Sequence, residues 1–329
     1  MSKSNLMAGF DPKFKTPEEY ILGCTYEIWE ERGVGLITDS YYSADCTLKT
    51  PLGVSNTASA VVAGTFATLA EFPDRQALAE DMIIGLQNVG FYSSHRVRTS
   101  ATHLGSGRFG HATGKALNML TIADCVCREN RIVDEWLVRN QAGIARQLGI
   151  DPVQFGAELG RANPAAAAPG SAALLDRWAD AKGLTIEGDK AIAMSVIDAW
   201  SAIWNGKNLR TMRDTYDRAV RFEAPTGELH YGVSNLDRVL ITMLSSIPDG
   251  TFKAHHAIAI RAPDRPVRVA VRWTYAGNHA GHGRYGAASG AELVLLGISH
   301  VELRDGRIIN EWMTLDELSV YAQIAVAKG

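Results

Sequence analysis

The chain has 329 residues, a hydrophobic content of 46% and a formal net charge of −3 at pH 7. This is about twice the length of a typical domain, so two domains with a core each are favoured. Basic and acidic residues are interspersed, which argues against nucleic acid or an anionic membrane as a partner. The start of the sequence lacks the apolar stretch of a signal peptide, and no run approaches the roughly 18 apolar residues of a membrane helix. We therefore expect a cytoplasmic protein.

The first predicted element is helical, because residues 20–42 have apolar side chains at helical spacing. A turn at Pro51 and Gly53 follows, and then a short helix that ends before Asp74. The next segments alternate as strands do, for example at residues 268–275 in the second half. Helices followed by antiparallel strands indicate the α+β class.

All four cysteines lie in the first half of the chain. Cys125 and Cys127 stand two residues apart in a strand-like run, so alternation places both side chains on one face. Packing as small apolar residues is favoured there over metal binding. We predict no metal site and no disulfide framework.

The pattern of the first half returns in the second half, at an offset of 175 or 176 residues. At the smaller offset Trp29 aligns with Trp204 and Tyr41 with Tyr216. At the larger offset the Arg-Ile and Glu-Trp pairs within residues 131–136 align with those within residues 307–312. We predict a first domain at 17–149 and a second at 189–329, joined by a helical, Ala/Pro-rich linker at 150–188 that ends in a helix at residues 172–182.

A G-x-G-x-x-G motif occurs in both halves, at residues 105–110 and 281–286. The motif marks a dinucleotide site only if it follows a first strand and opens a helix. Here strand-like residues stand on both sides of it. We therefore expect a hairpin loop in which the glycines supply positive φ, and we predict no cofactor.

The order of these motifs resembles the SnoaL-like polyketide cyclase and ester cyclase group of the NTF2-like superfamily. The shared features are the Pro-x-Gly turn, the Pro-Asp before the sheet and a His-x-Gly strand end at His103 and His279. A closing W-x-x-x-D strand stands at residues 312–316, and residues 136–140 read W-x-x-x-N instead. The resemblance covers both repeats. It implies two tandem cone domains, each with N-terminal helices packed on a curved antiparallel sheet around a small-molecule pocket.

The resemblance also implies a carboxylate or histidine inside the cone that moves a proton next to a carbonyl. Asp316 is the candidate carboxylate, because burial against an apolar pocket would raise its pKa. Asp316 also precedes the final helix, so it would serve as an N-cap. Asn140 in the first repeat would cap equally well, but it lacks the acid.

Two histidines are further catalytic candidates. Strand alternation turns His279 and His103 inward, where each would act as a base or an oxyanion donor, and capping of the strand end is the structural alternative. Other pocket candidates are aromatic or polar residues of both repeats, and core packing is the alternative for the aromatic ones. They are Trp312, Trp273, Tyr275, Trp204, His300, Trp136, Asn140 and Trp29.

Two functions follow from these observations. The first is a cofactor-independent enzyme that cyclises, isomerises, dehydrates or hydrolyses a small, mostly apolar carbonyl compound. The alternative is a non-catalytic ligand-binding or scaffold protein whose two domains form an intramolecular pseudo-dimer through their sheets. Open pockets with a buried carboxylate would favour the enzyme, and pockets filled by side chains would favour the scaffold. The sequence leaves further self-association open.

Overall fold

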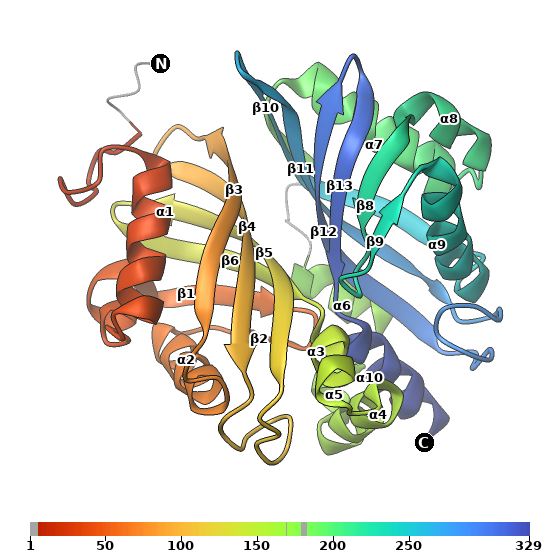
Figure 1. Ribbon diagram of the computed structural model, residues 1–329, viewed down its shortest axis with the longest axis horizontal. Helices are drawn as coiled ribbons and strands as arrows, with labels where there is room; N and C mark the ends of the chain where they lie inside the picture. The colour runs from red at the N-terminus through yellow and green to blue at the C-terminus, as the bar shows by residue number, and fades with distance from the viewer. Residues whose placement is uncertain (1–5, 169, 179–182) are drawn as a thin grey trace. The chain divides into compact units, whose positions relative to one another are not determined.

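The computed structural model describes residues 6–168, 170–178 and 183–329 (Figure 1). The chain divides into two compact units. Unit 1 runs up to Leu137 and includes Ile144–Ile150, and unit 2 comprises Val138–Gly143 and Asp151–Gly329. Of the helix expected at the end of the linker, the described part is α6 (Ser171–Trp178), and residues 179–182 lie outside the described residues.

Unit 1 has its helices before and between the strands of a six-stranded sheet. The elements are α1 (Pro17–Thr25), the π-helices η2 (Tyr26–Glu30) and η3 (Ile37–Tyr41), β1 (Tyr42–Thr50), β2 (Gly53–Ser55), α2 (Ala58–Glu71), β3 (Gln76–Leu86), β4 (Phe91–Thr102), β5 (Ala116–Arg128) and β6 (Arg131–Arg139), before α3 (Gln141–Leu148). The sheet order is β2-β1-β6-β5-β4-β3. β6 continues into residues of unit 2, and α3 begins in unit 2 and continues into unit 1.

The helical segment expected at residues 20–42 is interrupted. Thr16 caps its start by accepting a hydrogen bond from the Glu19 N–H. The break comes at Arg32, whose φ of 63° is left-handed, and at Gly33, where an added Cβ would lie 2.9 Å from the Glu27 carbonyl oxygen. Helical spacing therefore predicted helical structure here, but it did not predict the two π-helices or the break between them.

Unit 2 repeats this arrangement with additional elements at its start. Its elements are α4 (Pro152–Ala162), α5 (Pro164–Ala167), α6, β7 (Thr185–Gly188), α7 (Lys190–Trp204), the 3₁₀ turn η4 (Leu209–Thr211), α8 (Met212–Thr215), β8 (Tyr216–Glu223), β9 (Leu229–Tyr231), α9 (Val233–Ser246), β10 (Thr251–Ala262), β11 (Arg265–Asn278), β12 (Glu292–Arg304), β13 (Arg307–Leu315) and α10 (Glu317–Lys328). The seven-stranded sheet has the order β7-β10-β11-β12-β13-β8-β9.

The α+β class with helices packed on sheets is confirmed in both units, but the sheets are mixed. Strands β3 to β5 and β10 to β13 pair antiparallel, as expected. The pairs β1–β6, β8–β13 and β7–β10 are parallel. Long connections rather than hairpins separate the strands of these pairs, and a parallel pair requires such a connection.

The strand register assigns each side chain of the unit 2 sheet to one of two faces. Trp273 lies opposite Gly297, and Gly297 lies opposite Leu315, so these residues share a face. Trp204 of α7 packs on that face, with its ring centroid 5.8 Å from that of Trp273. Trp312 has the opposite strand parity to Leu315, so it points to the other face.

The G-x-G-x-x-G segments are hairpin loops, as expected, but positive φ explains only their last glycines. Gly110 and Gly286 have φ of 88° and 89°. At Gly105 an added Cβ would lie 1.7 Å from the Ala70 carbonyl oxygen, and at Gly281 1.8 Å from that of Ser245. The first glycine of each motif is therefore required where the loop approaches the end of α2 or α9. Among the helices of the described residues, none has the length and apolarity to cross a membrane.

Candidate functional site

A cavity of about 340 Å³ lies in unit 1, between the first helical segment and the sheet. One wall is formed by α1 and η2, through Ile21, Leu22, Gly23, Thr25, Tyr26 and Glu30. The other wall is formed by β3 and β4, through Ala77, Ala79, Met82, His95 and Val97. Figure 1 shows α1 beside β3. The lining is mainly apolar, and it includes one imidazole and one carboxylate.

The strand register shows which residues of unit 2 correspond to the sheet wall of this cavity. Ala77 lies opposite Thr99 in unit 1, as Phe252 lies opposite Tyr275 in unit 2. In the same way Ala79 lies opposite Val97, and Ala254 lies opposite Trp273. Ala77, Val97 and Thr99 therefore correspond to three large aromatic residues of the second repeat.

In unit 2 these positions belong to an aromatic cluster, which consists of Trp200, Trp204, Phe252, Trp273 and Tyr275. All five side chains are at most 4% exposed. The ring centroids of Trp204 and Tyr275 are 4.9 Å apart, and those of Phe252 and Trp273 are 6.0 Å apart. Rings at such separations are in packing contact. The aromatic cluster thus fills the space that corresponds to the cavity of unit 1.

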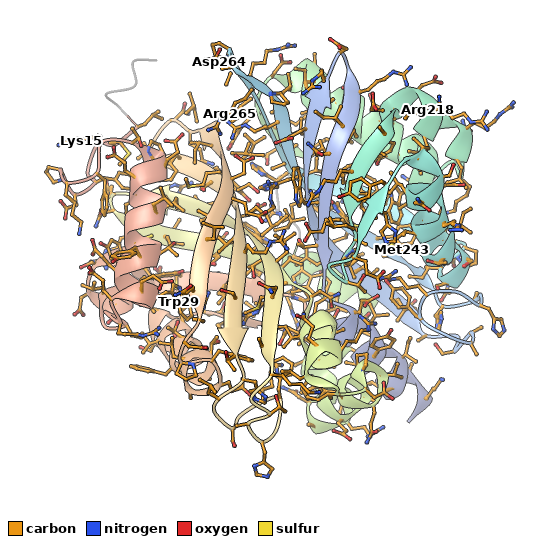
Figure 2. The ribbon with its side chains drawn as sticks, in the orientation of Figure 1. Lys15, Trp29, Arg218, Met243, Asp264 and Arg265 are labelled. Carbon is orange, nitrogen blue, oxygen red and sulfur yellow. The ribbon has the colours of Figure 1, made fainter. Side chains whose placement is uncertain are left out.

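The helix wall differs between the repeats as the sheet wall does: a small side chain in unit 1 corresponds to a large one in unit 2. At the offset of 175 residues, Trp200 of the aromatic cluster corresponds to Thr25, which lines the cavity. Trp29 corresponds to Trp204, but it does not line the cavity. Its ring stacks against the Arg75 guanidinium at 3.9 Å, and Figure 2 labels it at the end of the first helical segment. Small side chains at residues 25, 77 and 97 therefore leave the cavity open.

His95 is the titratable group in the sheet wall of the cavity. Its Nδ1 lies 3.2 Å from the Ser93 hydroxyl oxygen, so Nε2 is the ring nitrogen that remains for a ligand. Burial lowers the pKa of His95 to about 4, because desolvation disfavours the imidazolium. His95 is therefore a neutral imidazole at physiological pH.

Glu30 is the carboxylate in the helix wall. Its Oε1 accepts a hydrogen bond of 3.0 Å from the Ala77 N–H. In unit 2, Asn205 takes the corresponding place: its Oδ1 accepts from the Phe252 N–H at 2.6 Å, and its Nδ2 donates to the Phe252 carbonyl at 3.0 Å. The carboxylate reproduces only the first of these two hydrogen bonds, because it has no proton to donate.

A buried carboxylate that the sequence analysis did not single out lies on the helix-covered face of the unit 2 sheet. Glu311 is 1% exposed and accepts a hydrogen bond of 2.8 Å from the Tyr216 hydroxyl. Trp200 of the aromatic cluster donates to the same hydroxyl at 3.0 Å. Burial raises the pKa of Glu311 to about 7, and the hydrogen bond from Tyr216 opposes this shift. The repeated Glu-Trp pair was the sequence signal for this residue.

Asp316 and Asn140 are both helix caps. Asp316 Oδ1 accepts from the backbone N–H groups of Leu318 and Gln141, each at 3.1 Å. Its Oδ2 accepts from Gln141 Nε2 at 2.9 Å. Asn140 accepts from the Gly143 N–H and donates to the Pro225 carbonyl. Both oxygens of the Asp316 carboxylate are thus engaged by protein donors.

His103 and His279 lie at the corresponding strand ends and are fully buried. His103 Nδ1 is 3.2 Å from the Thr113 hydroxyl, and His279 Nδ1 is 2.8 Å from that of Ser289. Their backbone carbonyls accept from the N–H groups after the glycine loops. Neither histidine lines the cavity of unit 1. These contacts hold the hairpin loops in place.

The remaining pocket candidates are divided between the two faces of the sheets. Trp204, Trp273 and Tyr275 belong to the aromatic cluster. Trp312 lies opposite His300 on the other face of the unit 2 sheet. Trp136 packs beneath the Lys49 ammonium at 3.9 Å and near Tyr92, whose strand parity is opposite to that of His95. The structure does not bring the sequence-predicted residues together at one point.

Comparison with known proteins places a family match in unit 2. Residues 194–324 match the model of a family described as SnoaL-like polyketide cyclase. No curated protein sequence matches the chain. Among solved structures, TsrD from Streptomyces laurentii is 18% identical, with a TM-score of 0.36 over 43% of this chain and 99% of that chain. IdmH from Streptomyces antibioticus is 19% identical, with a TM-score of 0.34 over 40% of this chain and 97% of that chain.

Proposed function

We propose that unit 1 binds a small, mostly apolar carbonyl compound in its cavity and that His95 takes a proton from the carbon next to the carbonyl. The observation that carries this proposal is the cavity of about 340 Å³ with a neutral imidazole in an apolar wall. Small-molecule sites typically have volumes of about 300–1,000 Å³ and an apolar lining with few polar groups. The cavity therefore suits a compact ligand.

The lowered pKa leaves His95 unprotonated, so its Nε2 has a free electron pair that can take up a proton. The C–H proton moves to Nε2, the electron pair of that bond forms the C=C bond of the enolate, and the π pair of the carbonyl passes to its oxygen. The negative charge that develops beside the ring favours the imidazolium and raises its pKa as the reaction proceeds. Thr25 and Tyr26 belong to the same lining, and we assign their hydroxyls as the donors to the enolate oxygen. The scheme uses no cofactor.

The family match supports the reaction class, because the repeated motifs relate unit 1 to residues 194–324. Cyclisation, isomerisation, dehydration and hydrolysis of a carbonyl compound all use acid/base chemistry. We assign the proton transfer to His95 rather than to Asp316 or His279, because those side chains engage a helix cap and a strand-end loop. For unit 2 we propose a structural role, which the aromatic cluster favours.

The test uses 2-acetonaphthone, a small apolar ketone, as the probe. Calorimetric titration should give one site per chain, and NMR in D₂O should show exchange of the methyl protons next to the carbonyl. His95→Gln should retain binding and lose the catalysed exchange. Val97→Trp copies the residue of unit 2 into the cavity and should abolish binding.

The matched control is Val89→Trp, which adds the same ring at a residue that is 56% exposed. This variant should bind and exchange like the unsubstituted chain. Binding that survives Val97→Trp, or exchange that survives His95→Gln, would show that the site lies elsewhere.

A further inference from the structure

Besides the imidazole of His95, the cavity lining of unit 1 includes the carboxylate of Glu30, at the end remote from His95. Glu30 bonds the Ala77 N–H, and Ala77 lies opposite Thr99 on β4. His95 stands four residues before Thr99 on the same face of β4, which is a separation of about 13 Å at the rise of a β-strand. Val97 lies between them and contributes an apolar wall.

The second repeat shows what a purely structural side chain does at this position. Asn205 uses its amide oxygen and its amide nitrogen to bond the N–H and C=O of Phe252. Both polar atoms of Asn205 therefore serve the strand. Glu30 serves the strand through Oε1 alone, and its second oxygen can only accept hydrogen bonds.

We propose that Glu30 determines specificity by accepting a hydrogen bond from the ligand. The inference rests on the proposed function, because it takes the carbonyl end of the ligand to lie at His95. The ligand class is then an elongated, largely apolar carbonyl compound with a hydroxyl group at the end remote from the carbonyl. Glu30 and His95 both line the cavity of about 340 Å³, and a flat ring system or a chain is the shape that we assign to a ligand reaching from one to the other. A carboxylate at the remote end of the ligand would be repelled by Glu30.

The test compares two probes that differ only in one donor, 6-hydroxy-2-acetonaphthone and 6-methoxy-2-acetonaphthone. The first can donate to Glu30 through its hydroxyl, and the second cannot. A hydrogen bond to a charged group predicts that the hydroxy probe binds at least about tenfold more tightly, which corresponds to about 1.4 kcal/mol. Calorimetric titration gives both dissociation constants.

Glu30→Gln should remove this preference and keep the fold. The glutamine amide can bond Ala77 as Asn205 bonds Phe252, and then no acceptor remains for the ligand. Glu31→Gln is the matched control, because Glu31 is the exposed neighbouring acid and should leave the preference unchanged.

The outcomes separate the two proposals. Equal affinity of the two probes for the unsubstituted chain, or a preference that Glu30→Gln leaves intact, would overturn the role of Glu30 while the cavity remains the binding site. If neither probe binds, or if Val97→Trp binds both as well as the unsubstituted chain does, the proposed function fails and this inference fails with it.

Discussion

Val97 and Trp273 occupy the same position of the sheet in the two repeats, and each faces an alanine of the neighbouring strand, Ala79 or Ala254. One is a small side chain that lines a cavity, and the other is a buried ring of the aromatic cluster. The same backbone thus supports an open interior in unit 1 and a filled one in unit 2. The effect of this difference in side-chain volume can be tested by substitution in either unit.

Trp273→Val should open a cavity in unit 2 at a large cost in stability. Replacing a buried aromatic ring with a small side chain typically costs about 3–5 kcal/mol for a change to alanine, so we expect about 3 kcal/mol here. Denaturant unfolding measures the change. Leu229→Ala, at a residue that is 47% exposed, is the control and should cost less than about 0.5 kcal/mol.

Acidification should destabilise the chain through His95. The pKa of His95 is lowered from 6.5 to about 4, so the unfolded chain binds the proton more readily between these values. The free energy of unfolding therefore falls as the pH drops from 6.5 towards 4, by about 1–3 kcal/mol. His95→Gln should flatten this part of the stability curve. An unchanged slope in that variant would mean that other groups cause the acid sensitivity.

Glu311 should make the free energy of unfolding depend on pH with the opposite sign. Its pKa is raised from 4.5 to about 7, so the folded chain holds the proton between these values. Its contribution to stability is fully present below pH 4.5 and is lost as the pH rises through 7, by about 3 kcal/mol. Glu311→Gln keeps an acceptor for Tyr216 and should remove this loss. Glu228→Gln, at a side chain that is 69% exposed, should leave the curve as it is.

Substitutions at Asp316 test whether its carboxylate is a helix cap or a catalytic group. Asp316→Ala removes the cap of α10 and leaves buried donors of Gln141 without their acceptor, so we expect a loss of about 2–4 kcal/mol in stability. Asp316→Asn should lose less, because one amide oxygen remains as an acceptor. Both variants should retain exchange of 2-acetonaphthone wherever they are folded. Loss of exchange in a stable Asp316→Asn chain would make Asp316 the catalytic acid or base.

The sequence was sufficient for the α+β class and for the hairpin nature of the glycine loops, because each depends on periodicity or on local turn chemistry. The sequence did not show to which face of the sheet each side chain points. Trp273 on β11 and Trp312 on β13 are both large aromatic residues, and only the pairing of each strand with β12 shows that they point to opposite faces.

The cavity itself had a weak sequence signal. Thr25, Ala77 and Val97 are ordinary small residues far apart in the chain, and no motif includes them. Their importance appears only when each is compared with the tryptophan or phenylalanine at the same position of the second repeat. The sequence alignment of Tyr41 with Tyr216 was also wrong by one residue. In the strand register Tyr42 lies opposite Ile132 as Tyr216 lies opposite Ile308, so Tyr42 is the residue that corresponds to Tyr216.

The hydrogen bonds between Gln141 and Asp316 bear on the order in which the chain folds. The two residues are 175 positions apart, and the Gln141 N–H belongs to the first turn of α3. During synthesis α3 emerges long before its acceptor does, so its start stays solvated until the last strand and helix have formed. We expect this contact to be absent from the folding transition state, and substitutions at Asp316 should accelerate unfolding rather than slow refolding.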